Sequence, residues 1–216
     1  MRFETWEPIY IEILQDFGFS RERDEEAGRL LLALLGNRQK DCLMEASSEV
    51  CGRAVVVCGN AANLASDLEG FLRSSRDYTF IAADGATSIL LAARILPKIV
   101  VTDLDGKMED IIEANHMGSI VAVHAHGDNL DQLREYVPKL TKVIGTTQSR
   151  PPQGLHNFGG FTDGDRCVFL AKCLGASEIE LIGFDFEDKS VTPRKRKKLA
   201  WARRLINMAL ALEKCP

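Results

Sequence analysis

Carboxylate side chains directly follow two apolar stretches near the middle of this 216-residue chain. Asp84 comes after residues 80–83, and Asp103 and Asp105 come after residues 99–101. Carboxylates that lie close together repel one another unless a cation lies among them. Mg²⁺ suits such a cluster, because it prefers oxygen ligands and usually bridges one or two carboxylates to substrate phosphates. The three aspartates are therefore candidate catalytic and metal-binding residues, and phosphoryl or diphosphoryl transfer is the predicted reaction class.

The segments around these aspartates predict how they are positioned. Residues 80–83 and 99–101 are apolar, and the second run is β-branched, so both are predicted to form buried strands. Residues 86–96 between them have apolar positions three and four apart, which indicates a helix. Such a unit crosses over right-handed and makes its strands parallel. If the strands are neighbours, their carboxyl ends place the aspartates where such sheets bind ligands.

The same alternation continues along the chain and predicts an α/β fold. We expect a Rossmann-like three-layer domain with a mainly parallel sheet of about six strands, plus an N-terminal helical cap. The predicted regions are an N-terminal helical region (1–51), an α/β catalytic core (52–192) and a C-terminal helix packed on the core (193–216). Further strands are expected at residues 54–58, 120–123, 142–146 and 179–182, and helices at residues 21–35, 62–72, 107–116, 130–140 and 167–174.

The composition is that of an ordinary globular protein, with 45% hydrophobic and 27% charged residues. The net charge of −4 argues against a protein that coats nucleic acid, so we expect no nucleic-acid partner. No apolar run approaches the ~20 residues that span a bilayer, and the first residues lack a secretory pattern. The six cysteines form no C-x-x-C pair, which indicates reduced thiols. We expect a cytoplasmic protein without a membrane partner and leave homo-oligomers open.

Other residues are candidates for contact with an anionic co-substrate. Gly59 and Asn60 follow the first strand, where the backbone approaches a phosphate or simply makes a tight turn. Lys195 and Lys198 belong to a basic run that either closes over phosphates or is a solvated helix start. Arg166 would balance phosphate charge on the same side of the sheet.

Two histidines near the fourth predicted strand invite a different interpretation. His124 and His126 are two residues apart and could belong to a transition-metal site. No third His or Cys lies at a useful spacing, so we expect no zinc there.

Several short motifs together resemble a known family. Residues 83–86 (ADGA) and 97–106 (PKIVVTDLDG) are similar to the acidic motifs of thiamine pyrophosphokinase catalytic domains. Residues 124–129 (HAHGDN), 159–166 (GGFTDGDR) and 183–186 (GFDF) are more similar to a related family, the archaeal 6-hydroxymethyl-7,8-dihydropterin pyrophosphokinases, called MptE-like. The resemblance covers roughly residues 55–205.

This resemblance implies a function. It implies an ATP-dependent diphosphotransferase that requires Mg²⁺, moves diphosphate from ATP to the hydroxymethyl group of a reduced pterin and leaves AMP, in folate or tetrahydromethanopterin biosynthesis. By position, Asp128 would join the three aspartates as a metal ligand and nucleotide contact. Thr102 and Gly106 stand where the thiamine enzymes have glycine and serine, which favours the pterin substrate.

The long loop over residues 148–161 is the expected place for the pterin. It is rich in Pro and Gly, and long irregular loops on α/β sheets often carry function. A pterin is flat and needs aromatic faces and hydrogen-bond acceptors. Asn157, Phe158, Phe161 and Asp163 are the candidates for this substrate site.

Two alternatives to this function stay open at this point. One is a thiamine or other alcohol diphosphokinase on the same fold, which a panel of acceptor alcohols would separate. The other is a non-enzymatic nucleotide-binding or RNA-binding module that uses the basic run, for which RNA affinity would depend steeply on salt.

Overall fold

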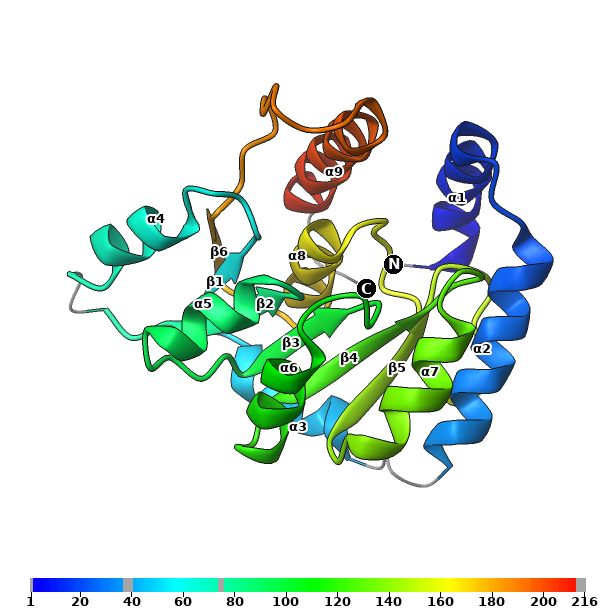
Figure 1. Cartoon of the computed structure of the whole chain (residues 1–216), viewed down its shortest axis with the longest axis horizontal. Helices are drawn as coiled ribbons and strands as arrows, with labels where there is room; N and C mark the ends of the chain where they lie inside the picture. The colour runs from blue at the N-terminus through cyan, green and yellow to red at the C-terminus, as the bar shows by residue number, and fades with distance from the viewer. Residues whose placement is uncertain (1, 37–40, 74–75, 213–216) are drawn as a thin grey trace.

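The computed structural model describes residues 2–36, 41–73 and 76–212. Its centre is a six-stranded sheet in which neighbouring strands are all parallel, in the order β5-β4-β3-β2-β1-β6 (Figure 1). This confirms the predicted α/β class and the parallel sheet. The strands are β1 (Ala54–Cys58), β2 (Thr79–Ala83), β3 (Ile99–Thr102), β4 (Ile120–Ala125), β5 (Val143–Thr147) and β6 (Glu178–Ile182).

Helices cover both faces of the sheet and complete three layers. One face carries α2, α4, α5, α6 and α7, and the other carries α1, α3, α8 and α9. Because strands β1 to β5 are buried on both faces, their sequences are apolar runs rather than alternating ones. The helices are α1 (Phe3–Phe17), α2 (Arg21–Leu35), α3 (Cys42–Val50), α4 (Leu64–Phe71), α5 (Ala86–Ala92), α6 (Met108–His116), α7 (Leu130–Tyr136), α8 (Asp163–Cys173) and α9 (Pro193–Ala211), and a short 3₁₀ helix, η1 (Val137–Lys139), follows α7.

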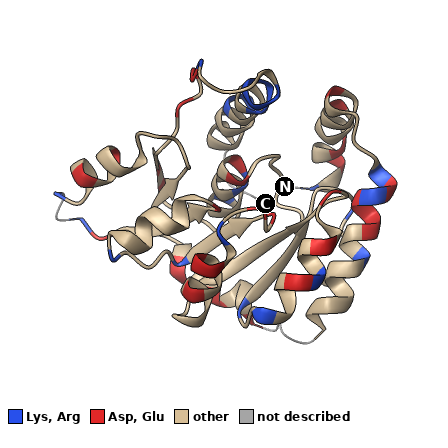
Figure 2. Cartoon of the chain, in the orientation of Figure 1, with Lys and Arg blue, Asp and Glu red and all other residues tan. Residues whose placement is uncertain are grey.

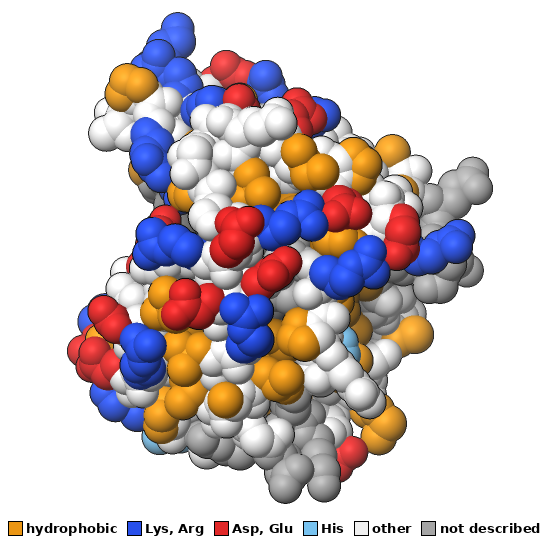
Figure 3. All heavy atoms as spheres, turned by 90° about the vertical axis from the view of Figure 1, so that its right-hand side faces the viewer, with side chains coloured by type: hydrophobic (Ala, Val, Ile, Leu, Met, Phe, Trp, Pro, Cys, Tyr) orange, Lys and Arg blue, Asp and Glu red, His pale blue; other side chains and the backbone are white. Residues whose placement is uncertain are grey.

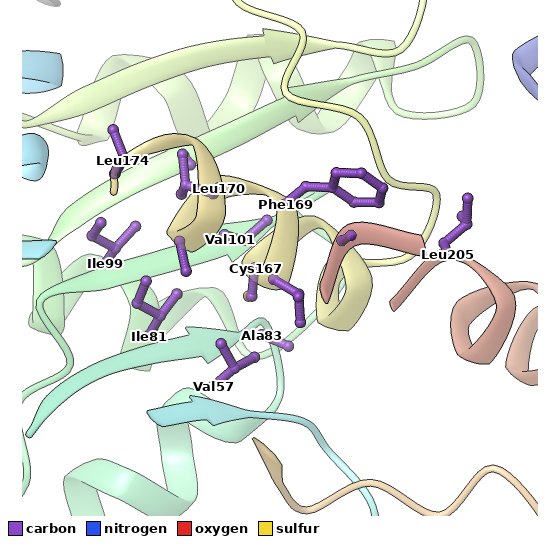
Figure 4. Packing of buried hydrophobic residues seen from close by; sticks show 14 of the residues in the cluster. Val57, Ile81, Ala83, Ile99, Val101, Cys167, Phe169, Leu170, Leu174 and Leu205 are labelled. Atoms are coloured by element: carbon purple, nitrogen blue, oxygen red, sulfur yellow. The ribbon is translucent and has the colours of Figure 1, made fainter. Parts of the chain in front are cut away.

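The core that supports the site lies under α8. This helix packs on the middle of the sheet, and α9 packs on the outer side of α8. Figure 4 shows the apolar side chains of three strands meeting those of α8, with Leu205 of α9 at the margin. The contacting residues from the strands are Val57, Ile81, Ala83, Ile99 and Val101, and those from α8 are Cys167, Phe169, Leu170 and Leu174.

The strand order reverses at β1, and this defines a crevice. β2 lies on one side of β1 and the last strand, β6, lies on the other. Open α/β sheets bind ligands outside the carboxyl ends of the strands at such a reversal. The topology therefore points to the space between the ends of β1 and β6.

Some element boundaries differ from the predicted ones. β4 runs through Ala125, so His124 belongs to the strand and not to the loop after it. α8 begins at Asp163, earlier than predicted, because Thr162 and Asp165 form a reciprocal capping box at its start. Helix α2 has the predicted bounds, and Gly36 follows it with φ 53°.

The N-terminal helices precede the sheet, as expected, and they are built into both layers rather than stacked on one side. The division of the chain into three regions stays a prediction. The face formed by α1 and α2 carries interspersed basic and acidic side chains, with no large area of one sign (Figure 3). Within the described residues, no helix is long and apolar enough to cross a membrane.

Candidate functional site

The carboxyl ends of β2 and β3 bring three carboxylates together. β2 and β3 are paired neighbours, so Asp84, which follows β2, lies beside Asp103 and Asp105, which follow β3. One ligand oxygen from each of the three lies within 4.8 Å of the others. Among the described residues, this is the group of His, Cys, Asp and Glu side chains that could hold a metal ion. We call Asp84, Asp103 and Asp105 the acidic trio.

The loop after β3 fixes the geometry of the acidic trio. The Thr102 hydroxyl donates to Asp84 and accepts the backbone N–H of Leu104 at 2.8 Å. Leu104 has φ 70° and a buried side chain, so the chain turns sharply between Asp103 and Asp105. At Gly106 any Cβ would overlap the Asp84 carboxylate, so only glycine fits there.

Asp84 has a role that differs from a helix cap. An aspartate just before a helix commonly accepts backbone N–H groups of the first turn. Here Gly85 occupies the N-cap position of α5 without a side-chain cap, and the Asp84 carboxylate bonds to Thr102 instead. The side chain is therefore committed to the acidic trio.

The electrostatics of the trio are those of crowded, partly buried carboxylates. Burial and the neighbouring Asp103 raise the pKa of Asp84, and burial together with Asp103 raises the pKa of Asp105 to about 6. Although burial opposes it, hydrogen bonding from His126 and Asp105 holds the pKa of Asp103 below its usual range. The trio thus favours bound positive charge, as a proton or a metal cation.

Two oxygens of the trio fit a cation. Asp84 Oδ1 and Asp103 Oδ1 are buried and have no hydrogen-bond partner among the described residues. Buried polar atoms are nearly always satisfied by a partner, and carboxylate oxygens are the ligands of hard divalent cations. The donor set therefore suits Mg²⁺.

A cavity of about 460 Å³ opens beside the trio at the strand reversal. We call it the large cavity. Its volume is that of a site for a nucleotide-sized ligand. It is lined by the ends of β1, β2, β3 and β6, by the start of α8 and by α9, through Gly59, Asn60, Asp84, Asp103, Asp105, Gly106, Phe161, Asp163, Gly183, Phe184, Phe186, Lys195 and Lys198 among others.

Glycines allow the ends of β1 and β6 to lie close together at the large cavity. A Cβ at Gly59 would lie 2.5 Å from the backbone oxygen of Gly183 and 3.1 Å from the Phe184 ring. The β1 and β6 ends therefore approach closely, and the Gly59 N–H donates to the Ile182 carbonyl at 2.9 Å. Phe184 and Phe186 stand on the same wall with ring centroids 5.5 Å apart, and they offer aromatic faces to a flat ring. These two rings were not among the predicted site residues, although they belong to the GFDF motif.

The start of α9 supplies positive charge opposite the trio. Figure 2 shows basic residues gathered at this end of α9. Lys195 and Lys198, one helical turn apart, line the large cavity, and the Lys198 ammonium lies 6.0 Å from the centroid of the Phe161 ring. Lys197 points elsewhere, since its ammonium lies 3.1 Å from Asp16 of α1. The basic run is thus divided between the cavity and the contact with α1.

Arg166 lies behind the site and not on the wall of the large cavity. Its guanidinium is buried and bonds to His124 Nδ1 at 2.9 Å, to Gln148 Oε1 at 3.2 Å and to the Phe161 carbonyl at 2.8 Å. Arg166 therefore makes hydrogen bonds inside the protein in place of the predicted phosphate contact. Its side chain extends from α8 toward the ends of β4 and β5. Burial and the Arg166 charge lower the pKa of His124, which is neutral and accepts from the guanidinium.

Asp128 is not brought to the acidic trio. Its carboxylate lies 3.6 Å from Arg23 of α2, and the side chain is half exposed. The predicted fourth metal ligand is thus absent from the cluster. Asp163 lines the large cavity, as do Asp185 and Asp188, and burial together with Asp103 and Asp84 raises the pKa of Asp163 well above the usual range. The pterin contact expected of Asp163 stays a prediction.

The long loop has two parts with different positions. Asn157 donates to the carbonyls of Gln148 and Ser149 at 3.0 Å, so its amide holds the loop together. Phe158 stacks on His156 and packs against the core. Only the end of the loop, at Phe161, reaches the large cavity. The predicted pterin contacts of Asn157 and Phe158 are therefore not supported by their positions, since local hydrogen bonds and core packing occupy both.

His126 is a member of the site for which the sequence suggested another role. Its Nε2 lies 3.5 Å from Asp103 Oδ2. His124, in contrast, is buried in β4 between Arg166 and Thr146. The two rings stack at 6.0 Å without forming part of a metal-ligand group among the described residues.

Comparisons with known proteins agree on one family. Residues 33–190 match the family model described as 6-hydroxymethylpterin diphosphokinase MptE-like. The chain is 49% identical to the 6-hydroxymethyl-7,8-dihydropterin pyrophosphokinase of Methanothermobacter thermautotrophicus, over 96% of this chain and 94% of that protein. It is 42% identical to the protein of the same name from Pyrococcus furiosus, over 95% and 93% of the two chains.

A further relative and a solved structure extend these comparisons. The protein of the same name from Methanocaldococcus jannaschii is 37% identical, over 96% of this chain and 95% of that one. Among solved structures, the MAf glycosyltransferase from Magnetospirillum magneticum AMB-1 is similar with a TM-score of 0.51 and 15% identity, over 82% of this chain and 35% of that larger chain. At this identity the likeness concerns the fold alone.

Proposed function

Since this chain belongs to the MptE-like family of 6-hydroxymethylpterin diphosphokinases, we propose that it transfers the diphosphate of ATP to 6-hydroxymethyl-7,8-dihydropterin, with Mg²⁺ held by the acidic trio. The products are AMP and the pterin diphosphate, which would serve folate or tetrahydromethanopterin biosynthesis. The chain is an enzyme of the diphosphotransferase class by its family. The observation that carries the ATP and Mg²⁺ assignment is the large cavity, which joins the acidic trio to Lys195 and Lys198.

The residues of the large cavity divide the tasks of this reaction. Asp84, Asp103 and Asp105 would hold Mg²⁺, which neutralises the charge of a triphosphate when it is bound. Lys195 and Lys198 donate to phosphate oxygens from the opposite wall. Phosphoryl transfer needs little covalent help from the protein, so most of the acceleration comes from positioning and from charge stabilisation.

The base of the nucleotide fits the wall at the strand reversal. Phe184 and Phe186 offer faces for a flat ring, and glycine at positions 59 and 183 lets the ends of β1 and β6 approach closely. With the base there, the phosphates run toward the trio and the start of α9. ATP therefore occupies the large cavity along its length.

The decisive experiment is an assay of products. The purified protein is incubated with ATP, Mg²⁺ and 6-hydroxymethyl-7,8-dihydropterin, and AMP and the pterin diphosphate are separated by chromatography. We expect both products in equal amounts, and no turnover when EDTA replaces Mg²⁺. Formation of ADP instead of AMP would contradict diphosphate transfer.

A parallel incubation tests the acceptor. Thiamine replaces the pterin at the same concentration, and we expect essentially no AMP, because a site that hydrogen-bonds one heterocycle rejects another that lacks the matching groups. Comparable rates on thiamine would contradict the pterin assignment and leave the Mg²⁺ chemistry intact.

A further inference from the structure

A second, smaller hollow lies farther along the same edge of the sheet. The large cavity spans the ends of β6, β1, β2 and β3, whereas this hollow of about 90 Å³ lies beyond the ends of β4 and β5 and against the junction of α1 and α2. We call it the small hollow. Phe19, Asp24, His126, Gly127 and Gln148 line it.

The small hollow contains a buried carboxylate. Asp24 is 2% exposed and accepts hydrogen bonds from the Tyr10 hydroxyl, from Gln148 Nε2 and from the Gly127 backbone N–H, each at 2.8 Å. Burial and Asp24 raise the pKa of Tyr10 well above its usual range, so the phenol stays protonated and donates. Two of the three bonds go to Oδ2 and one to Oδ1. A carboxylate offers about four acceptor positions, so Oδ1 keeps one for a further donor.

The small hollow adjoins the acidic trio. His126 lines the hollow and lies 3.5 Å from Asp103, which lines the large cavity. Phe19 lines the hollow, and its ring packs 6.4 Å from that of Phe161, another wall of the large cavity. A ligand in the hollow therefore comes close to the trio on the side away from the strand reversal.

The geometry of the proposed reaction requires a binding site for the acceptor alcohol on the β4 and β5 side of the acidic trio. In a transfer from ATP, the attacking oxygen and the departing AMP lie on opposite sides of the transferred phosphorus. If the adenosine lies between the ends of β1 and β6, the acceptor alcohol approaches the trio from the β4 and β5 side. A cavity of about 10 Å³ beside Phe158 is too small to receive a ring.

We propose that the small hollow receives the aminopyrimidinone half of the pterin, with Asp24 accepting an N–H of that edge and Phe19 providing an apolar face. This placement rests on the proposed function. The reduced ring and its hydroxymethyl group then project past His126 toward Asp103. A carboxylate suits this edge, because the amino group and the ring N–H of the aminopyrimidinone are both donors. Asp24 thus becomes a residue that determines the acceptor, supplied by helices in which the sequence showed no chemistry.

Binding measurements test this placement. We expect Asp24→Asn to weaken the binding of 6-hydroxymethyl-7,8-dihydropterin by roughly tenfold or more, since hydrogen bonds to charged groups contribute about 1.5–3 kcal/mol. The affinity for ATP and Mg²⁺ should stay within a factor of two. Glu26→Gln is the matched control, because Glu26 is exposed on the same helix and the charge change is identical. Equal pterin affinity in a folded Asp24→Asn protein would overturn the proposal.

A measurement on the wild-type protein tests the same placement without relying on the folding of the Asp24→Asn variant. Hydrogen exchange read by mass spectrometry, with the pterin and without nucleotide, should show protection of residues 18–24 and 126–128. Protection confined to residues 183–191 would overturn the placement while product formation by the same protein sample upholds the proposed function. Absence of pterin diphosphate in that sample would overturn the proposed function and this placement together.

Discussion

The acidic trio and the lysines of α9 face the same cavity, but the protein holds them in opposite ways. The trio lies on the ends of adjacent central strands, with Thr102 bonded to Asp84 and with Gly106 packed against it. Lys195 and Lys198 lie on an outer helix, and neither has a carboxylate within ion-pair distance among the described residues. We therefore expect the proposed metal site to keep a fixed geometry and the proposed phosphate contact to adapt to its ligand.

Removal of a trio carboxylate should have the largest effect. Asp105→Asn keeps the shape of the side chain and removes one charged metal ligand, so we expect turnover to fall by roughly 10³-fold at saturating Mg²⁺. Without metal, the same variant should melt at a higher temperature than the wild type, because it relieves repulsion from Asp103 and Asp84. Rate measurements and thermal melts check both parts. A near-normal rate would show that Asp105 is not a metal ligand.

A methyl group added at Gly106, beside the acidic trio, should have the second largest effect. Gly106→Ala places a methyl group on the Asp84 carboxylate, and we expect turnover to fall about 10²-fold and the free energy of unfolding to drop by roughly 1–3 kcal/mol. Gly70→Ala in α4 is the control, because its Cβ would meet nothing within 4 Å and an alanine favours a helix. Steady-state kinetics and urea unfolding give the two quantities. Equal activity in both variants would show that the trio tolerates displacement.

The lysines should give a smaller and more selective effect. We expect Lys195→Ala with Lys198→Ala to raise the KM for ATP about tenfold or more and to leave the KM for the pterin nearly unchanged. Lys197→Ala removes one charge from the same run and breaks contacts with Asp16 and the Phe17 ring of α1, away from the large cavity, so it serves as the control for each single lysine substitution. If all three substitutions act alike on ATP, the effect comes from net charge and not from position.

The pH dependence of stability should give the smallest effect. Burial raises the pKa of both Asp105 and Asp165 to about 6, from an ordinary value of 3.8. The folded protein therefore binds protons more tightly than the unfolded chain, and the corresponding stability, present below about pH 4, is lost as the pH rises through about 6. Bound Mg²⁺ should remove the pH dependence that comes from Asp105 and leave the pH dependence that comes from Asp165. Thermal melts with and without Mg²⁺ across this pH range would separate the two contributions. Stability that rises over the same range without metal would contradict this account.

The sequence predicted the trio because its position depends on local signals. Two apolar runs, a helical spacing between them and the rule for crossovers were sufficient to bring Asp84 next to Asp103 and Asp105. The metal itself, ATP and the pterin stay proposals, since they rest on the resemblance and on the fit of the donors.

The residues that the sequence misplaced depend on contacts between distant segments. The Arg166 side chain points into the protein because His124 and Gln148 accept hydrogen bonds from its guanidinium. The local sequence pattern of α8 does not indicate this orientation. Asp128 meets Arg23, which is more than a hundred residues away in the chain. Asn157 is fixed by carbonyls of its own loop, in a conformation that a composition rich in Pro and Gly does not determine.

The contacts between α1 and α9 have a consequence for how the protein folds during synthesis. Trp201 Nε1 donates to Asp16 at 2.7 Å, and Arg204 bonds to Glu12, so these contacts link residues more than 180 positions apart. Likewise, β6 can pair with β1 only after most of the chain has been synthesised. A chain emerging from the ribosome therefore carries the aspartates of the trio long before the helix that closes the large cavity over them. The ATP binding proposed for this cavity would then require the folded C-terminal helix, and bound ATP would favour fully folded chains over partly folded ones.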